Sequence, residues 1–157
     1  MQNEKTFTFE EIKKKLEHYC AYQERCHNEV VQKLKTMTIS ETVSDTVIVH
    51  LIENKYLNEE RFACSFARGK HRIKHWGKIR IVNELKFRKI SQYNINTALK
   101  EITLEEYSAS FHSLAEKQWE TIKERSLPKK KKKFCDFLLR KGFESHLIYD
   151  KVNELAR

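Results

Sequence analysis

The chain repeats itself three times, and this repetition limits what it can fold into. Residues 30–40, 81–91 and 134–144 align without a gap, at offsets of 51 and 53 residues. Self-similarity at such a period is the signature of a repeat architecture. The aligned columns hold apolar residues in all three copies: Val30, Ile81 and Phe134; Leu34, Leu85 and Leu138; Ile39, Ile90 and Phe143; Ile48, Leu99 and Val152; Leu51, Ile102 and Leu155.

Each copy has the pattern of a small helical bundle. An apolar pair spaced i, i+4 marks a short helix, and a tight turn and a further helix follow it. The 157 residues include 3 Gly and 1 Pro, too few turn residues for an all-β protein. The sequence therefore predicts an all-α fold of three tandem three-helix modules, residues 8–55, 56–103 and 104–157, in an elongated or curved arrangement.

Helix ends are marked by capping residues. A longer helix begins each module, with Thr8–Glu11 and Thr103–Glu106 as capping boxes and Asn58 as an N-cap. The paired glutamates that follow these caps suit the positive end of the helix dipole, so helix capping explains them better than acid–base chemistry. Further predicted caps are Ser40 and Ser91 at N-termini and Gly142 at a left-handed C-terminus.

Positive charge is concentrated in the middle module. Residues 61–90 contain ten Lys or Arg and one acid, Glu84, and a second basic run, PKKKKK, spans 128–133. Internal alignment places both runs in the lead-in to the second helix of their modules. A solvated face is the ordinary explanation, but clustered cations repel one another unless an anion is bound. We therefore favour contact with a polyanion or an acidic protein surface. The candidates are Arg68, Lys70, Arg72, Lys74, Trp76, Lys78, Arg80, Lys86, Arg88, Lys89, Lys129, Lys130, Lys131, Lys132 and Lys133.

Trp76 lies inside the basic stretch and has two possible roles. It can plug the turn as a core residue, or it can reach outward to stack on a base or a partner surface. The other aromatic residues at helical spacing are expected in the core: Phe62, Phe66, Phe111, Trp119, Phe134 and Phe137.

Catalytic and metal-binding patterns are missing from the sequence. It contains no phosphate-binding loop, dinucleotide fingerprint or nucleophile elbow. His71 and His75 are spaced i, i+4, but no CxxC accompanies them and lysines surround them, so we expect no metal, cofactor or catalytic residue. No apolar run reaches membrane-spanning length. The four cysteines are not dense enough for a disulfide framework, so we expect reduced thiols in a cytoplasmic protein.

The residues of the middle module match a known pattern. The run YLNEERFACSFARGKHRIKHWGKIRIVNELKFRKIS resembles the central motif of the RecX family, bacterial regulators of the RecA recombinase. FLLRKGFESHLIYDKV and YCAYQERCHNEVVQKL resemble that family's C-terminal and first-module motifs, so the resemblance covers residues 8–157. The matching positions are Glu59, Glu60, Phe62, Ala63, Arg68, Arg72, Gly77, Ile81, Glu84, Leu85, Lys89 and Ile90.

The resemblance implies a regulator that is not an enzyme. Proteins of this family bind along the groove of the RecA–DNA filament and modulate its growth, ATPase and strand exchange in recombination, DNA repair and the SOS response. The implied partners are the RecA filament and single- or double-stranded DNA. The protein itself is expected to be a cytoplasmic monomer that contacts no membrane. The alternative is a stand-alone nucleic-acid-binding protein of helix-turn-helix type. We expect Arg68→Glu with Arg72→Glu to weaken partner binding and leave folding nearly intact.

Overall fold

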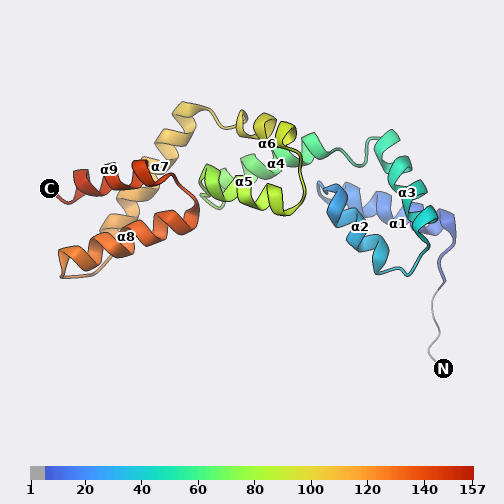
Figure 1. The fold of residues 1–157 in the computed structure, drawn as a ribbon, viewed down its shortest axis with the longest axis horizontal. Helices are drawn as coiled ribbons and strands as arrows, with labels where there is room; N and C mark the ends of the chain where they lie inside the picture. Colours follow the sequence, from blue (N-terminus) through green and yellow to red (C-terminus); the bar gives the residue numbers. More distant parts are fainter. Residues whose placement is uncertain (1–5) are drawn as a thin grey trace, which may run out of the picture.

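The protein is a chain of helices laid along one long axis (Figure 1). The computed structural model describes residues 6–157, and within that span it contains nine helices and no strand. The helices are α1 (Phe9–Tyr22), α2 (His27–Lys35), α3 (Glu41–Glu53), α4 (Glu59–Arg72), α5 (Lys78–Phe87), α6 (Gln92–Leu99), α7 (Leu104–Thr121), α8 (Leu127–Lys141) and α9 (Ser145–Leu155).

Three helix triplets follow one another from the N-terminal end to the C-terminal end. They are module 1 (α1–α3), module 2 (α4–α6) and module 3 (α7–α9), and module 2 lies between the other two (Figure 1). The predicted all-α, tandem three-helix fold is therefore confirmed. The elongated shape follows from modules that pack only on their neighbours along the chain.

The predicted caps are confirmed in atomic detail. The side chains of Thr8, Asn58 and Thr103 accept hydrogen bonds from backbone N–H groups three residues on, at the starts of α1, α4 and α7. Ser40 and Ser91 do the same for α3 and α6. Each cap satisfies a backbone donor that the helix cannot pair internally, which contributes about 1 kcal/mol.

The three repeat copies share an unusual backbone position. Gly142 ends α8 with φ of 93° in the left-handed region. Thr38 and Lys89 occupy the same column of the internal alignment, and both also have positive φ, 53° and 61°. Glycine adopts this conformation without a steric penalty, whereas the other two residues adopt it at a cost of about 1 kcal/mol or more. The turn is thus a conserved geometric element of the repeat within this chain, whatever residue occupies it.

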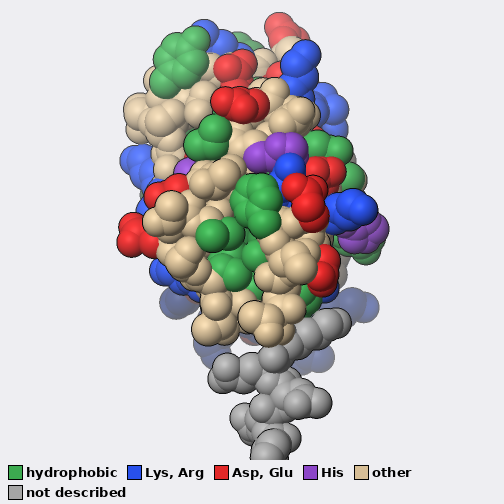
Figure 2. Space-filling view, turned by 90° about the vertical axis from the view of Figure 1, so that its right-hand side faces the viewer, with side chains coloured by type: hydrophobic (Ala, Val, Ile, Leu, Met, Phe, Trp, Pro, Cys, Tyr) green, Lys and Arg blue, Asp and Glu red, His purple; other side chains and the backbone are tan. Residues whose placement is uncertain are grey.

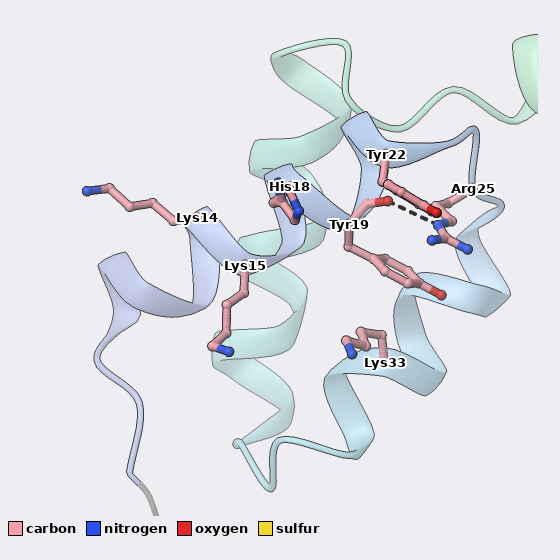
Figure 3. Close-up of a pocket in the computed structure, with 7 residues that line it drawn as sticks. All are labelled: Lys14, Lys15, His18, Tyr19, Tyr22, Arg25 and Lys33. Atoms are coloured by element: carbon pink, nitrogen blue, oxygen red, sulfur yellow. Dashed lines mark hydrogen bonds between the residues drawn. The ribbon is translucent and has the colours of Figure 1, made fainter.

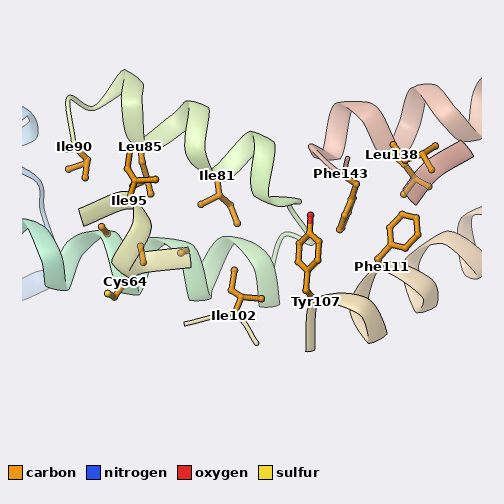
Figure 4. Close-up of a cluster of buried hydrophobic side chains, with 14 of the residues drawn as sticks. Cys64, Ile81, Leu85, Ile90, Ile95, Ile102, Tyr107, Phe111, Leu138 and Phe143 are labelled. Carbon is orange, nitrogen blue, oxygen red and sulfur yellow. The ribbon is translucent and has the colours of Figure 1, made fainter. Parts of the chain in front are cut away.

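The buried side chains form two separate clusters. Module 1 has its own core around Leu16, Val30 and Leu51. A second, larger core runs without interruption from module 2 into module 3, and the Tyr107 and Phe143 rings lie where the two modules meet (Figure 4). Modules 2 and 3 therefore pack as one unit, and Cys26 of module 1 also belongs to their cluster.

The predicted core aromatics all contribute to this second core. Phe62, Phe111 and Phe134 are buried. Phe66, Trp119 and Phe137 are partly buried and pack against the same cluster.

The second basic run lies in a different place from the one expected. It was predicted to precede a short helix, but α8 begins at Leu127, with Ser126 as its N-cap and Pro128 in the first turn. Proline tolerates this position because the N–H that it lacks would be unpaired there in any case. The run 129–133 therefore forms the first turns of a 15-residue helix rather than a loop.

Module 1 forms the N-terminal end of the molecule and carries a mixed surface. Acidic, basic and hydrophobic side chains are interspersed on this end (Figure 2). Val49 and Ile52 on α3 are each 51% exposed. Residues 8–55 contain seven Lys or Arg and eight Asp or Glu, so the excess of positive charge belongs to modules 2 and 3.

Candidate polyanion-binding surface

The predicted site residues come from four places in the structure. Those of module 2 lie at the end of α4, in the link that follows it, and along α5 and its C-terminal turn. Those of module 3 lie in the first turns of α8. The link between α4 and α5 touches module 3, so part of this surface is built at the joint between the two modules.

Two glycines bring modules 2 and 3 into backbone contact. Gly77 N donates to Lys141 O at 2.7 Å, and Ile79 N donates to Gly142 O at 3.0 Å. A Cβ added to Gly77 would lie 2.3 Å from Gly142 O. Neither position has room for a side chain, because a Cβ on Gly142 would likewise lie 2.3 Å from Arg80 Cβ. The joint is therefore a close-packed contact, which fixes how α5 and α8 face each other.

Tyr107 completes the joint with a buried hydroxyl group. Its Oη accepts a hydrogen bond from Lys78 N at 3.0 Å and donates one to Glu144 Oε1 at 2.7 Å. Burial, followed by the hydrogen bond to Glu144, raises the pKa of Tyr107, so the hydroxyl remains a neutral donor. The ring of His71 stacks on that of Tyr107 at 5.3 Å between centroids.

Some predicted binding residues are instead engaged in ion pairs. Arg72 Nε lies 2.7 Å from Glu106 Oε1, and the hydrogen bond from Arg72 lowers the pKa of Glu106. Arg68 Nη1 lies 3.2 Å from Glu101 Oε2. Arg88, Lys132 and Lys133 are also paired, with Glu84, Asp136 and Glu124 respectively.

This pairing changes the meaning of the expected charge-reversal test. Reversing Arg68 and Arg72 would set new carboxylates against Glu101 and Glu106, and the second pair bridges modules 2 and 3. Like charges at such distances repel. A loss of binding in that double variant would therefore report on the joint as well as on the surface, and unpaired lysines make a cleaner test.

Trp76 is half-buried and packed between cations. Arg80 Cζ lies 4.1 Å and Lys70 Nζ lies 5.0 Å from its ring. Its edge packs on Phe66, at 6.1 Å between centroids. Arg88 Cζ in turn lies 4.8 Å from the Phe66 ring. The two aromatic rings thus contact three cations by cation–π interactions. Trp76 also packs against the core of modules 2 and 3, so it combines part of both predicted roles.

Nine of the predicted cations have no carboxylate partner within residues 6–157. Four lie in module 2 outside the Trp76 contacts, two lie beside Trp76, and the other three begin α8. Unpaired cations are the ones whose charge is available to an anionic partner. They are Lys70, Lys74, Lys78, Arg80, Lys86, Lys89, Lys129, Lys130 and Lys131.

Sequence reasoning missed one cation, Lys141, that the joint adds to this surface. Arg80 Nη1 donates to Arg140 O at 3.2 Å, and Lys141 Nζ donates to Lys74 O at 3.1 Å. These contacts bring the end of α8 beside the α4–α5 link. The internal alignment of the three copies offers a signal for Lys141, which occupies the same column as Arg88. Arg88 also contacts the preceding module, since its Nε lies 3.9 Å from Glu29 Oε1 of module 1.

The two histidines considered as metal ligands do not form a metal site. His71 is buried, and its Nδ1 lies 2.9 Å from the Trp76 carbonyl oxygen, so it serves the α4–α5 link. His75 is exposed, with φ of 59°. Across residues 6–157, no group of three or more His, Cys, Asp or Glu side chains is placed to hold a metal ion. None of the helices described is long and apolar enough to cross a membrane.

The fold and the cation-rich joint define a tandem three-helix repeat protein. Residues 58–99 match the second three-helix domain of RecX, and residues 105–152 match its third three-helix domain. The chain is 32% identical over 127 residues to the regulatory protein RecX of Leuconostoc mesenteroides, covering 79% of this chain and 48% of the relative. It is 27% identical over 137 residues to that of Bacillus cytotoxicus, covering 87% and 51%.

Solved structures agree with the sequence matches. The crystal structure of RecX from Lactobacillus salivarius superposes with a TM-score of 0.79 at 26% identity, over 94% of this chain and 96% of that one. Another RecX crystal structure, at 22% identity and a TM-score of 0.78, shares the fold over 92% of this chain and 74% of its own. The chain belongs to the RecX family. It spans about half the length of the relatives matched by sequence.

Proposed function

We propose that this chain regulates the RecA recombinase, mainly as an inhibitor, by binding along the groove of the RecA–DNA filament. In this role it acts in the cytoplasm and modulates filament growth, ATPase and strand exchange during recombination and DNA repair. Family membership supports the choice of partner, since the relatives are named regulatory protein RecX.

The unpaired cations are the observation that carries the proposal. The DNA in such a filament carries a chain of phosphates, and each lysine that meets a phosphate releases bound counterions. Module 2 and the start of α8 present nine cations without carboxylate partners in the described chain. The end-to-end arrangement of modules suits a partner that also repeats along an axis (Figure 1).

The test is the DNA-dependent ATPase of RecA titrated with this protein. We expect inhibition by the native chain and weaker inhibition by the variant Lys74→Glu, Lys86→Glu, Lys129→Glu, whose three side chains are exposed. The matched control is Lys35→Glu, Lys100→Glu, Lys123→Glu, which makes the same charge change at exposed lysines outside the candidate surface. An unchanged ATPase with the native chain would refute the proposal, and equal loss in both variants would refute the assigned surface.

Stand-alone nucleic-acid binding is the second candidate, and the same cations favour it. Duplex binding driven by phosphates weakens with salt at a slope of about −0.9 in log–log units for each phosphate neutralised. Tight, sequence-selective binding to DNA in the absence of RecA would favour this candidate over the first.

A further inference from the structure

Module 1 contains a basic pocket that lies outside the surface described above. The pocket has a volume of about 470 Å³ and lies between α1 and α2. Its lining includes Lys14, Lys15, Arg25 and Lys33 together with two tyrosines, and no carboxylate (Figure 3). Such a pocket stands out because module 1 otherwise carries a mixed surface.

The cations of this α1–α2 pocket are arranged around one tyrosine ring. Arg25 Cζ lies 3.8 Å and Lys33 Nζ lies 5.5 Å from the Tyr19 ring. Arg25 Nε also donates to the Tyr19 carbonyl oxygen at 3.0 Å, as the dashed line in Figure 3 marks. The guanidinium group is therefore held in place before any ligand arrives, although Glu29 Oε2, 3.8 Å from Nη1, offsets part of its charge.

The second tyrosine is placed to contact a ligand. Tyr22 is 77% exposed, and its ring extends toward Arg25 at the rim of the pocket (Figure 3). A solvent-exposed ring beside clustered cations matches the two halves of a nucleotide, since the ring can stack on a base while the cations meet its phosphate. In a duplex the faces of the bases are hidden by their neighbours, so only an unpaired strand offers a base to such a ring.

We propose that the α1–α2 pocket is a nucleotide-binding site for single-stranded DNA, in which Tyr22 stacks on a base and Arg25, Lys15 and Lys33 bind the phosphates beside it. Tyr19 positions Arg25, and burial raises the pKa of Tyr19, so its hydroxyl stays neutral and can donate to a phosphate oxygen. The inference rests on the proposed function for its choice of DNA as partner. It adds a second contact, at the opposite end of the chain from module 3.

The test is fluorescence anisotropy with the full chain and a labelled oligothymidylate, without RecA. Tyr22→Ala combined with Lys15→Gln and Lys33→Gln should weaken binding at least about ten-fold and reduce the salt slope by about 0.7 for each lysine. A matched control, Tyr93→Ala with Lys100→Gln and Lys123→Gln, removes an exposed tyrosine and two exposed lysines elsewhere and should change binding less than about two-fold. Circular dichroism verifies that both variants fold.

An abasic oligomer of equal length separates stacking from charge. Tyr22→Ala alone should weaken binding of oligothymidylate about five-fold or more and leave binding of the abasic strand unchanged. Equal binding by the pocket variant and its control would overturn the inference, as would an equal effect of Tyr22→Ala on both strands. Competition by polyglutamate as strong as that by DNA would show an acidic peptide site instead.

These outcomes are distinct from a failure of the proposed function. A chain that binds oligothymidylate through this pocket but leaves the RecA ATPase unchanged would contradict recombinase regulation and support the pocket. A chain that inhibits the ATPase while its pocket variant binds the oligomer like the control would contradict the pocket alone.

Discussion

Replacing Gly77 by alanine tests the joint between modules 2 and 3. The added Cβ would lie 2.3 Å from Gly142 O, 2.4 Å from Gly142 C and 2.5 Å from Phe143 N. All three atoms belong to the backbone and cannot rotate away. An ordinary contact begins near 3.4 Å, so α5 and α8 would have to separate by about 1 Å.

This separation sets the size of the effect. Two backbone hydrogen bonds cross the joint, from Gly77 N to Lys141 O and from Ile79 N to Gly142 O, at 2.7 and 3.0 Å. A shift of about 1 Å stretches both beyond useful length, which costs about 0.5–1.5 kcal/mol for each bond. Together with the strain of overpacking, Gly77→Ala should lower the free energy of unfolding by about 2–4 kcal/mol.

Gly69 provides the matched control for this experiment. It lies within α4, and a Cβ added there meets nothing within 4 Å. Gly69→Ala should therefore stabilise the protein by about 0.5–1 kcal/mol, since alanine favours the helix. Urea unfolding followed by circular dichroism measures both variants. A loss below about 0.5 kcal/mol for Gly77→Ala would refute the close-packed joint.

Two more residues at the joint and one cysteine give further tests. Tyr107→Phe leaves the partly buried Lys78 N–H without its acceptor and should cost about 1–3 kcal/mol in urea unfolding. An unchanged stability would contradict a structural role for this hydrogen bond. Arg72 lowers the pKa of Glu106, so this pair stabilises the fold above the ordinary carboxyl pKa, and the contribution is lost as pH falls through the lowered pKa. Arg72→Gln should raise the pKa of Glu106 in an NMR titration, and an unchanged pKa would contradict the pair. Cys135 is the most accessible of the four thiols and should react first with a disulfide reagent at pH 8. Simultaneous labelling of all four would contradict the burial of the other three.

The fold was predictable because its signals are local and repeated. Apolar columns such as Leu34, Leu85 and Leu138 recur at fixed offsets, and each is buried. Caps such as Asn58 act within one turn of helix, so their effect does not depend on the rest of the structure. The module boundaries 8–55, 56–103 and 104–157 and the binding role of the basic residues remain predictions.

The candidate site was less predictable because it depends on contacts between distant residues. No sequence pattern links Arg72 to Glu106, and this pair turns a predicted binding residue into a joint residue. The placement of Lys141 beside Lys74 likewise follows from the Gly77–Gly142 contact, which only the three-dimensional packing shows. The α1–α2 pocket was missed because its cations are scattered along a segment with little net charge.

The most direct test of the proposed function is a helical reconstruction by electron cryomicroscopy of a RecA–DNA filament saturated with this protein. The filament-groove proposal predicts continuous density along the groove, fitted by the three modules in chain order, with Lys74, Lys86 and Lys129 facing the filament. Density confined to filament ends, or an empty groove at saturating protein, would contradict it.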